Sequence, residues 1–249
     1  MVKLSVNVNK VATLRNSRGG KLPNVHDAVR VCVEAGAPGI TVHPRADERH
    51  ITRADVHEIA ALLRARPERI EFNIEGDPRP ELIELVLKVR PTQCTLVPVR
   101  PGEITSQAGW PEDTPLDSMR PIVRRLKNAG VRVSLFVDPV AAAITWAAEA
   151  GADRVELYTE PYARACHHGR EHGDSSFRRY ADAAEQAHQQ HLGINAGHDL
   201  DLENLKLFRH LPHLAEVSIG HALISHALYV GLDKAVRDFL AALDPEPRA

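Results

Sequence analysis

The stretch NAGVRVSLFVDPVAAAITWAAEAGADRVELYTEP, residues 128 to 161, contains the pattern that predicts the fold of this chain. Twice within it, a sequence typical of a helix ends in Ala-Gly and a short aliphatic run follows. The same sequence pattern occurs earlier, in EAGAPGITVHP at residues 34 to 44. The glycine suits a left-handed C-terminal cap, and the aliphatic run suits a buried strand. The repeated unit is therefore a helix, a glycine and a strand.

Extending this unit along the chain predicts eight strands that alternate with eight helices. The strands are predicted at residues 3–9, 39–43, 70–75, 93–97, 132–138, 154–159, 192–196 and 216–219. The helices are predicted at residues 26–35, 53–65, 79–89, 118–128, 140–150, 175–190, 202–210 and 222–243. Alternating strands and helices form parallel sheets, and eight such units can close into a barrel. We therefore predict one α/β domain over residues 1–249, a (β/α)8 TIM barrel with extra helices possible and a frayed tail at 244–249.

The main alternative fold is an open doubly wound sheet, which would carry a Gly-rich dinucleotide-binding turn after its first strand. The segment VNVNKVATLRNSRGG, residues 6 to 20, contains no GxGxxG and therefore favours the barrel. The long first loop, Lys10 to Asn24, is rich in Arg, Asn and Gly. We expect this loop to form an ordered lid or a substrate loop.

The composition describes a globular chain with an aliphatic core. Hydrophobic residues make up 43% of the 249 residues and aromatic residues only 4%, so Val, Ile, Leu and Ala must build most of the core. The formal charge is -2, from 31 Lys and Arg against 33 Asp and Glu. Such a balance provides no basic field for general nucleic-acid binding, so any anion site must be local.

Cysteine usage and the N-terminal residues predict a cytoplasmic location. Cys32, Cys94 and Cys166 show no CxxC spacing, and two of them fall in apolar patterns typical of buried reduced thiols. MVKLSVNVNK begins a strand at once, and no stretch approaches the ~18 apolar residues of a membrane span. We therefore expect a protein of the reducing cytoplasm, without membrane or nucleic-acid partners.

Polar residues gather where the predicted strands end, which in a TIM barrel is the face that carries the chemistry. They are Asn7, Asn9, His43, Arg45, Asn73, Glu75, Asp138, Glu156, Glu160, Asn195, His198, Gly220 and His221. Each one has a structural explanation when taken alone, such as a turn cap or a core histidine. Their convergence on one rim, with Asn73 and Glu75 at the even spacing of one strand face, predicts a functional site instead.

The last two predicted strands carry a pattern typical of phosphate binding. INAGHDL and SIGHALI each place a glycine turn and a His, His198 or His221, directly before a predicted helix. Free backbone N–H groups and the positive end of a helix would then face the barrel mouth. Arg18, Arg45 and a partly charged His50 could bind a second anion. Two anion sites imply two phosphorylated small molecules or one doubly phosphorylated molecule, with Glu75, His43 and His198 able to move protons between them.

Metal and covalent-lysine chemistry are disfavoured by the residues that the strands provide. Strand 1 offers Asn7 and Asn9, a poor pair of metal ligands, and the histidines of HPRADERH lie seven residues apart on an irregular loop. A Schiff-base aldolase needs a lysine inside the barrel, and Lys10 is the only nearby candidate. We therefore expect no metal and no cofactor.

The motifs, taken in order, closely resemble those of the pyridoxine 5'-phosphate synthase family. They are VNVNKVATLRNSRGG, ITVHPRADERHIT, FNIEG, LVP, EIT, INAGHDL and SIGHALI, and they span nearly the whole chain. The resemblance implies a cofactor-free TIM barrel of the de novo vitamin B6 pathway, assembled as a homo-octamer. It implies condensation of 3-amino-2-oxopropyl phosphate with 1-deoxy-D-xylulose 5-phosphate, yielding pyridoxine 5'-phosphate, inorganic phosphate and water.

The resemblance also implies a role for each matching residue. The residues expected to bind the amino-ketone phosphate are Asn7, Arg18, Gly220 and His221. Those expected to bind the deoxyxylulose phosphate are Arg45, His50 and Thr105. Proton transfer falls to His43, Glu75 and His198, and stabilisation of a charged intermediate to Glu156.

This chain departs from the family pattern in three respects. Many members have Asp-His where this chain has Asn9 and Lys10, so these two side chains must bind substrate differently. The catalytic glutamate of such members lies nearer to the position of Asn73, whereas here the glutamate is Glu75, two residues on and on the same strand face. A Gly that often follows the last catalytic His is here Asp199, which we also assign to substrate binding.

Two other functions stay open on the residues alone. A different phosphosugar isomerase or cofactor-free aldolase would use Glu75 and His43 on one phosphorylated substrate. A non-catalytic sensor of a phosphorylated metabolite would keep the anion sites, but it would have no use for three proton-transfer groups beside them.

Overall fold

Eight parallel strands close into a barrel in the computed structural model, which describes residues 1–99 and 107–244. The strands are β1 (Lys3–Asn7), β2 (Gly39–Val42), β3 (Glu71–Gly76), β4 (Gln93–Leu96), β5 (Arg132–Val137), β6 (Arg154–Tyr158), β7 (Gly193–Gly197) and β8 (Leu214–Ile219). Each strand pairs with its neighbours in the sequence, and β1 pairs with β8 to close the ring. The predicted fold class is therefore confirmed.

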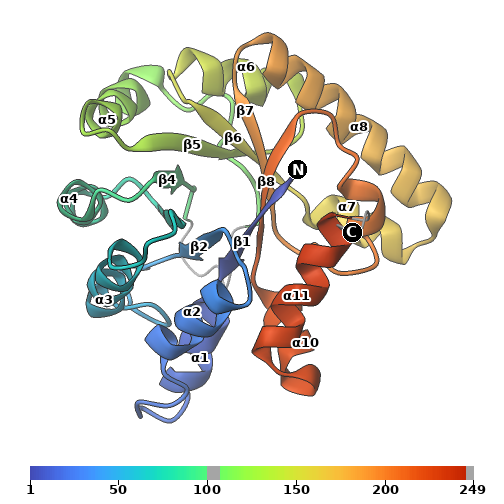
Figure 1. Cartoon of the computed structure of the whole chain (residues 1–249). Coiled ribbons are helices and arrows are strands. Elements are labelled where there is room, and N and C mark those ends of the chain that lie inside the picture. Colours follow the sequence, from blue (N-terminus) through green and yellow to red (C-terminus); the bar gives the residue numbers. More distant parts are fainter. Residues whose placement is uncertain (100–106, 245–249) are drawn as a thin grey trace.

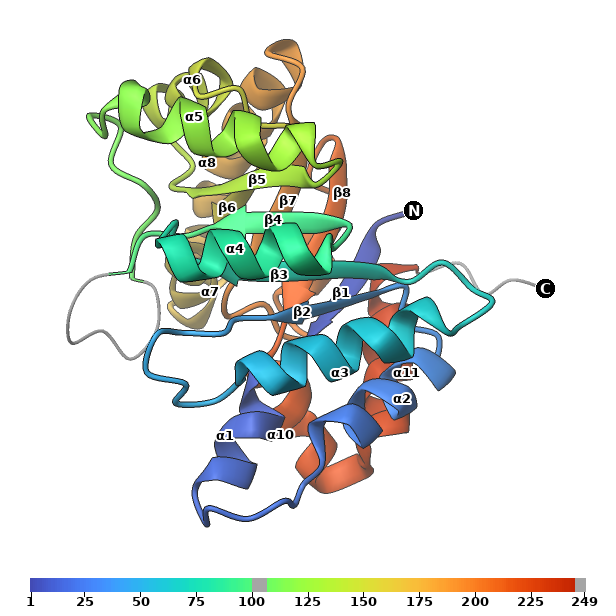
Figure 2. The same cartoon turned by 90° about the vertical axis from the view of Figure 1, so that its left-hand side faces the viewer.

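Helices surround this barrel, as Figure 1 shows. Within the described residues they are α1 (Asn9–Asn16), α2 (Val25–Glu34), α3 (Arg53–Arg64), α4 (Pro80–Val89), α5 (Leu116–Asn128), α6 (Ala141–Glu149), α7 (Glu160–His167), α8 (Arg170–Gln189), α9 (Leu205–Phe208), α10 (His221–Val230) and α11 (Leu232–Leu243). None of the helices in these ranges has the length and apolar character that crossing a bilayer requires. Figure 2 shows the barrel from the side, with the carboxyl ends of the strands opposite the N-terminus.

The structure corrects the sequence prediction in several places. The expected loop from Lys10 to Asn24 begins as α1, a helix that packs beside α10 (Figures 1 and 2). Residues 160–167 form α7, a helix that was not predicted, and the predicted final helix is divided at Gly231, whose φ is 87°. After β7 the helix starts only at Leu205 and has four residues, so His198 does not directly precede a helix. Of the predicted frayed tail, residues 245–249 lie outside the described residues.

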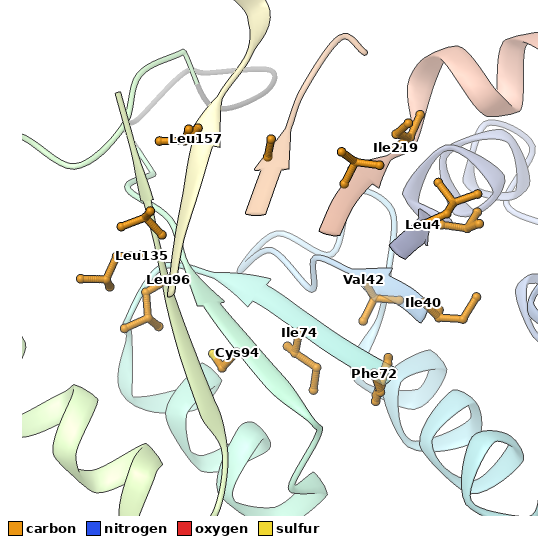
Figure 3. Packing of buried hydrophobic residues seen from close by; sticks show 14 of the residues in the cluster. Leu4, Ile40, Val42, Phe72, Ile74, Cys94, Leu96, Leu135, Leu157 and Ile219 are labelled. Atoms are coloured by element: carbon orange, nitrogen blue, oxygen red, sulfur yellow. The ribbon is translucent and has the colours of Figure 1, made fainter. Parts of the chain in front are cut away.

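The aliphatic core lies between the sheet and the helices. Alternate residues of the strands project apolar side chains that are almost completely buried, among them Ile40, Ile74 and Leu135, as Figure 3 shows. The helices bury their own apolar faces against this layer. Cys32 and Cys94 are buried free thiols, as predicted.

The other face of each strand points into the barrel, and there the core is polar. Buried residues on this face are Ser5, Thr41, Asn73, Gln93, Thr95, Ser134, Glu156, Asn195 and Glu216. The Asn195 side chain contacts the Gln93 side-chain oxygen at 3.3 Å, across the barrel from β7 to β4. Most of these buried side chains make hydrogen bonds to one another, whereas the Ser134 hydroxyl has no partner among the described residues. The polar interior therefore fixes the positions of its side chains and supports the cavity above it.

Candidate active site

A cavity of about 320 Å³ opens at the carboxyl ends of the strands. Its walls come from strands and loops that are far apart in the sequence. The lining residues are Asn7, Asn9, Lys10, His43, Arg45, His50, Glu75, Val97, Phe136, Glu156, His198, Asp199, Ser218, Gly220 and His221. These include every predicted site residue except Arg18 and Thr105. The polar residues predicted at the ends of the strands therefore line a single cavity.

One predicted residue does not line the cavity, one falls outside the described residues, and three lining residues were missed. Arg18 is exposed on the turn after α1 and does not line the cavity. Thr105 lies outside the described residues. Val97, Phe136 and Ser218 line the cavity but were not predicted. Ser218 had a signal in the sequence, because it lies two residues before Gly220, at the even spacing of the inner strand face.

Glu75 is the strand-3 residue that faces the cavity. Its side chain is buried, and its pKa is raised to about 8, chiefly by burial and then by the charge of Glu216. The carboxyl group is therefore mostly protonated near neutral pH. Asn73 lies one layer deeper, where its side chain is bonded to the hydroxyls of Thr41 (3.3 Å) and Thr95 (3.0 Å). This arrangement supports Glu75 rather than Asn73 in the chemical role.

His43 carries a buried ring nitrogen without a partner. Among the described residues no hydrogen bond reaches its Nε2, and the side chain lines the cavity. Burial, and then the charges of His50, Arg45 and other neighbours, hold the pKa of His43 well below its usual range. Its backbone N–H donates to Oδ1 of Asn9 at 2.9 Å, which fixes the end of β2. A neutral imidazole is thus held at the cavity with one nitrogen left for a ligand.

His198 follows β7 in a left-handed backbone conformation, with φ of 79°, and Asp199 has φ of 59°. The His198 ring packs in a three-ring cluster, with centroids 5.1 Å from Phe136 and 5.4 Å from Tyr158, which are themselves 5.4 Å apart. Burial lowers the pKa of His198, while the charge of Asp199 raises it. His198 is therefore also neutral near pH 7 and rigidly held.

Glu156 contributes a second buried carboxyl group. Its pKa is raised well above the ordinary value, first by burial and then by the charges of Glu75 and Glu216. The carboxyl group lies against Gly197, where an added Cβ would be only 2.3 Å from Oε1 of Glu156. A side chain at position 197 would therefore displace the Glu156 carboxyl group from its present position.

His50 is a neutral hydrogen-bond donor, which corrects the prediction that it is partly charged. Burial, followed by the charge of Arg45, lowers the pKa of His50 to about 4. Its Nδ1 accepts the backbone N–H of Ile51 at 2.9 Å, so the ring proton of the neutral form is on Nε2. Arg15 and Asn16 of α1 donate to the His50 carbonyl at 3.0 and 2.9 Å.

The N-terminus of α10 lies after β8, where the sequence predicted an anion site. The first backbone bond of this helix runs from Ile224 N–H to the carbonyl of Gly220, at 3.0 Å. The preceding amides of the first turn have no carbonyl acceptor within the helix and form a positive helix end. An added Cβ at Gly220 would be 3.1 Å from Cβ of Asn7, so β1 approaches closely here. Asn7 and His221 therefore flank the helix end that can hold a phosphate.

Two other features help to define the class of ligand. Within the described ranges, no three His, Cys, Asp or Glu side chains are grouped so that they could hold a metal ion. A larger groove of about 840 Å³ runs beside α5 and α6, but its acidic side chains, including Asp113 and Asp117, do not suit a phosphorylated ligand. The cavity at the barrel mouth is therefore the site with the required chemistry.

The closed barrel and its cavity of proton-transfer groups define the class of (β/α)8-barrel enzymes. The family model "Pyridoxal phosphate biosynthesis protein PdxJ" matches residues 4–245. The chain is also 52% identical over 240 residues to pyridoxine 5'-phosphate synthase of Bacteroides fragilis, covering 96% of this chain and 98% of the relative. The corresponding protein of Christiangramia forsetii is 50% identical over 244 residues, covering 98% and 100%. The chain belongs to the PdxJ family and is an enzyme of pyridoxine biosynthesis.

Solved structures of low sequence identity share the fold. Phosphoribosyl anthranilate isomerase from Thermotoga maritima superposes with a TM-score of 0.62 at 14% identity, covering 99% of this chain and 100% of that one. For 3-hexulose-6-phosphate synthase from Salmonella typhimurium, the TM-score is 0.61 at 14% identity, covering 97% and 98%. At this level of identity the likeness concerns the barrel alone.

Proposed function

We propose that this chain condenses 3-amino-2-oxopropyl phosphate with 1-deoxy-D-xylulose 5-phosphate to give pyridoxine 5'-phosphate, inorganic phosphate and water by cofactor-free acid/base catalysis. The observation that carries the proposal is the unpartnered Nε2 of His43, which is buried at a cavity shared with Glu75 and His198. The N-terminus of α10 follows β8 at this cavity, and Arg45 and His50 line it from the segment after β2. Two phosphorylated substrates would fit such an arrangement.

The anion-binding groups suggest how each substrate is held. The free amides of α10 would bind the phosphate of the amino ketone, with Asn7, Gly220 and His221 around it. Arg45 and Nε2–H of His50 would bind the phosphate of the sugar. Lys10, Asn9 and Asp199 line the space between and are assigned to substrate contacts, while Thr105 keeps its predicted role from the family resemblance.

The protonation states assign the proton-transfer steps. Amine and ketone would form an imine, proton shifts would expel phosphate and water, and an aldol-type closure would complete the ring. Glu75 is protonated near neutral pH and can donate to a leaving oxygen, whereas neutral His43 and His198 can accept a proton. The surroundings of Glu156 keep its carboxyl group neutral. A cationic intermediate beside it would favour the ionised carboxylate, which would then stabilise the positive charge.

The decisive experiment supplies the purified protein with both substrates and no added metal, and follows inorganic phosphate and pyridoxine 5'-phosphate together. We expect both products, and neither when one substrate is left out. Phosphate released from one substrate alone would indicate a lyase or isomerase instead. Tight binding without any product would indicate a sensor. The same samples, run on a sizing column with light scattering, test the octamer that the family resemblance implies.

A further inference from the structure

The turn after β7 has an unfavourable backbone conformation that the protein must hold in place. His198 and Asp199 are consecutive and both carry a Cβ, yet both have φ in the left-handed region, at 79° and 59°. Residues other than glycine avoid this region because Cβ crowds the neighbouring carbonyl. Such conformations persist at functional sites where surrounding contacts over-determine them.

Thr159, directly after β6, makes those contacts. It is fully buried, its backbone N–H donates to the carbonyl of Gly197 at 2.9 Å, and its hydroxyl approaches the same oxygen at 2.6 Å. The hydroxyl also contacts the carbonyl oxygen of His198. The side chain of Asn204 donates to the next carbonyl, that of Asp199, at 3.0 Å. The Thr159 hydroxyl thus shares its proton between the carbonyls of Gly197 and His198, and the Asn204 side chain holds the carbonyl of Asp199.

The hydroxyl of Thr159 is used for this contact in place of its usual local role. Thr159 is the N-cap residue of α7, where a threonine side chain ordinarily accepts a backbone N–H of its own helix. Here no side-chain capping bond is made, and the hydroxyl reaches across to β7. A capping function therefore does not explain why this buried residue carries a hydroxyl group.

We propose that Thr159 is a positioning residue for the reaction: its hydroxyl holds the left-handed His198–Asp199 turn, and this turn directs the His198 ring into the cavity. The rings of Phe136 and Tyr158 contact the His198 ring, and the turn sets the position of its Cα and Cβ atoms. This inference rests on the proposed proton-transfer role of His198. Asn204 supports the same turn from the opposite end.

The test replaces the hydroxyl with a methyl group of the same shape, in Thr159→Val. We expect kcat to fall on the order of 10–100-fold with KM nearly unchanged, because displacing a catalytic group by about 1 Å costs this much. Thr159→Ser keeps the hydroxyl and should restore most of the rate. In the substrate-free protein, the ¹³Cε1 signal of His198 should move in Thr159→Val and return in Thr159→Ser. Thr145→Val is the matched control, since that hydroxyl accepts bonds from Gln186 and Gln190 on the surface.

Two results would overturn the proposal: a normal kcat in Thr159→Val, or a loss of rate without any change of the His198 signal. The signal is read without substrate, so it tests the turn even if His198→Ala retains full turnover and the proposed function fails. If Thr159→Val does not fold, Thr159→Ala takes its place, because it also lacks the hydroxyl group. Thr159→Ala should lower kcat and move the His198 signal relative to Thr159→Ser, and an unchanged rate or an unchanged signal would contradict the proposal.

Discussion

The side-chain nitrogen of Asn7 lies 3.4 Å from Oε2 of Glu75, although 68 residues separate the two in the chain. Asn7 ends β1 and Glu75 lies near the end of β3, so the contact passes over β2 at the barrel mouth. Oδ1 of Asn7 accepts the backbone N–H of Asn9 at 3.0 Å, which fixes the orientation of the amide and presents its nitrogen to Glu75. A residue of the proposed phosphate site thus orients the proposed acid.

Replacing this acid should abolish most of the turnover. We expect Glu75→Gln to lower kcat by about 10²–10⁴-fold, the usual contribution of a general acid, while both substrates still bind. Steady-state kinetics and calorimetric titration of each substrate measure the two effects separately. Glu112→Gln, at an exposed glutamate that does not line the cavity, is the control. If Asn73→Ala proved far more damaging than Glu75→Gln, the assignment of the strand-3 role would be wrong.

The same substitution should change the pH dependence of stability. The pKa of Glu75 is raised from 4.5 to about 8 in the folded protein, so its neutral form is the stable one there. This contribution is fully present below about pH 4.5 and is lost as pH rises toward 8, because the unfolded chain ionises first. The Tm of Glu75→Gln minus that of the parent should therefore increase between about pH 5 and 8. A difference that stays constant over this range would show that Glu75 titrates normally.

The ion pair of Arg15 and Asp55 should control binding of the sugar phosphate. Arg15 contacts both carboxylate oxygens of Asp55, at 2.5 and 2.9 Å, and also donates to the carbonyl of His50. Lys cannot make this set of bonds, so Arg15→Lys should lower the free energy of unfolding by about 1–3 kcal/mol. KM for the sugar phosphate should rise more than kcat falls. Urea unfolding and steady-state kinetics measure these two effects. The control is Arg30→Lys, because Arg30 forms exposed ion pairs with Asp27 and Glu34, and neither stability nor KM should change much.

The charges of Asp199 and Lys10 should shift the pKa of His198 in opposite directions. Asp199 raises the pKa of His198 and Lys10 lowers it, although burial has the largest effect. We expect Asp199→Asn to move this pKa down and Lys10→Gln to move it up. An NMR titration of the His198 ring, with Asp117→Asn as a remote control, measures both shifts. Shifts of the same sign would contradict the arrangement of charges around the ring.

Local patterns in the sequence were sufficient for the fold and for most of the site. The helix, glycine and strand unit depends on residues close together in the chain, so it predicted the eight strands within a few positions. Because parallel strands end on one face of a barrel, the polar residues at those ends also identified the cavity. His43, Glu75 and Gly220 could be named for this reason before any coordinates were considered.

Only the tertiary structure decided the protonation states and the exact partners of these groups. Neutral His50, protonated Glu75 and the unpartnered Nε2 of His43 follow from burial and from charges contributed by distant segments, which a local pattern does not contain. The same holds for Asn73, which is satisfied by hydroxyls of neighbouring strands. The sequence therefore determined which residues meet at the barrel mouth, and non-local packing determined the charge and orientation with which they meet.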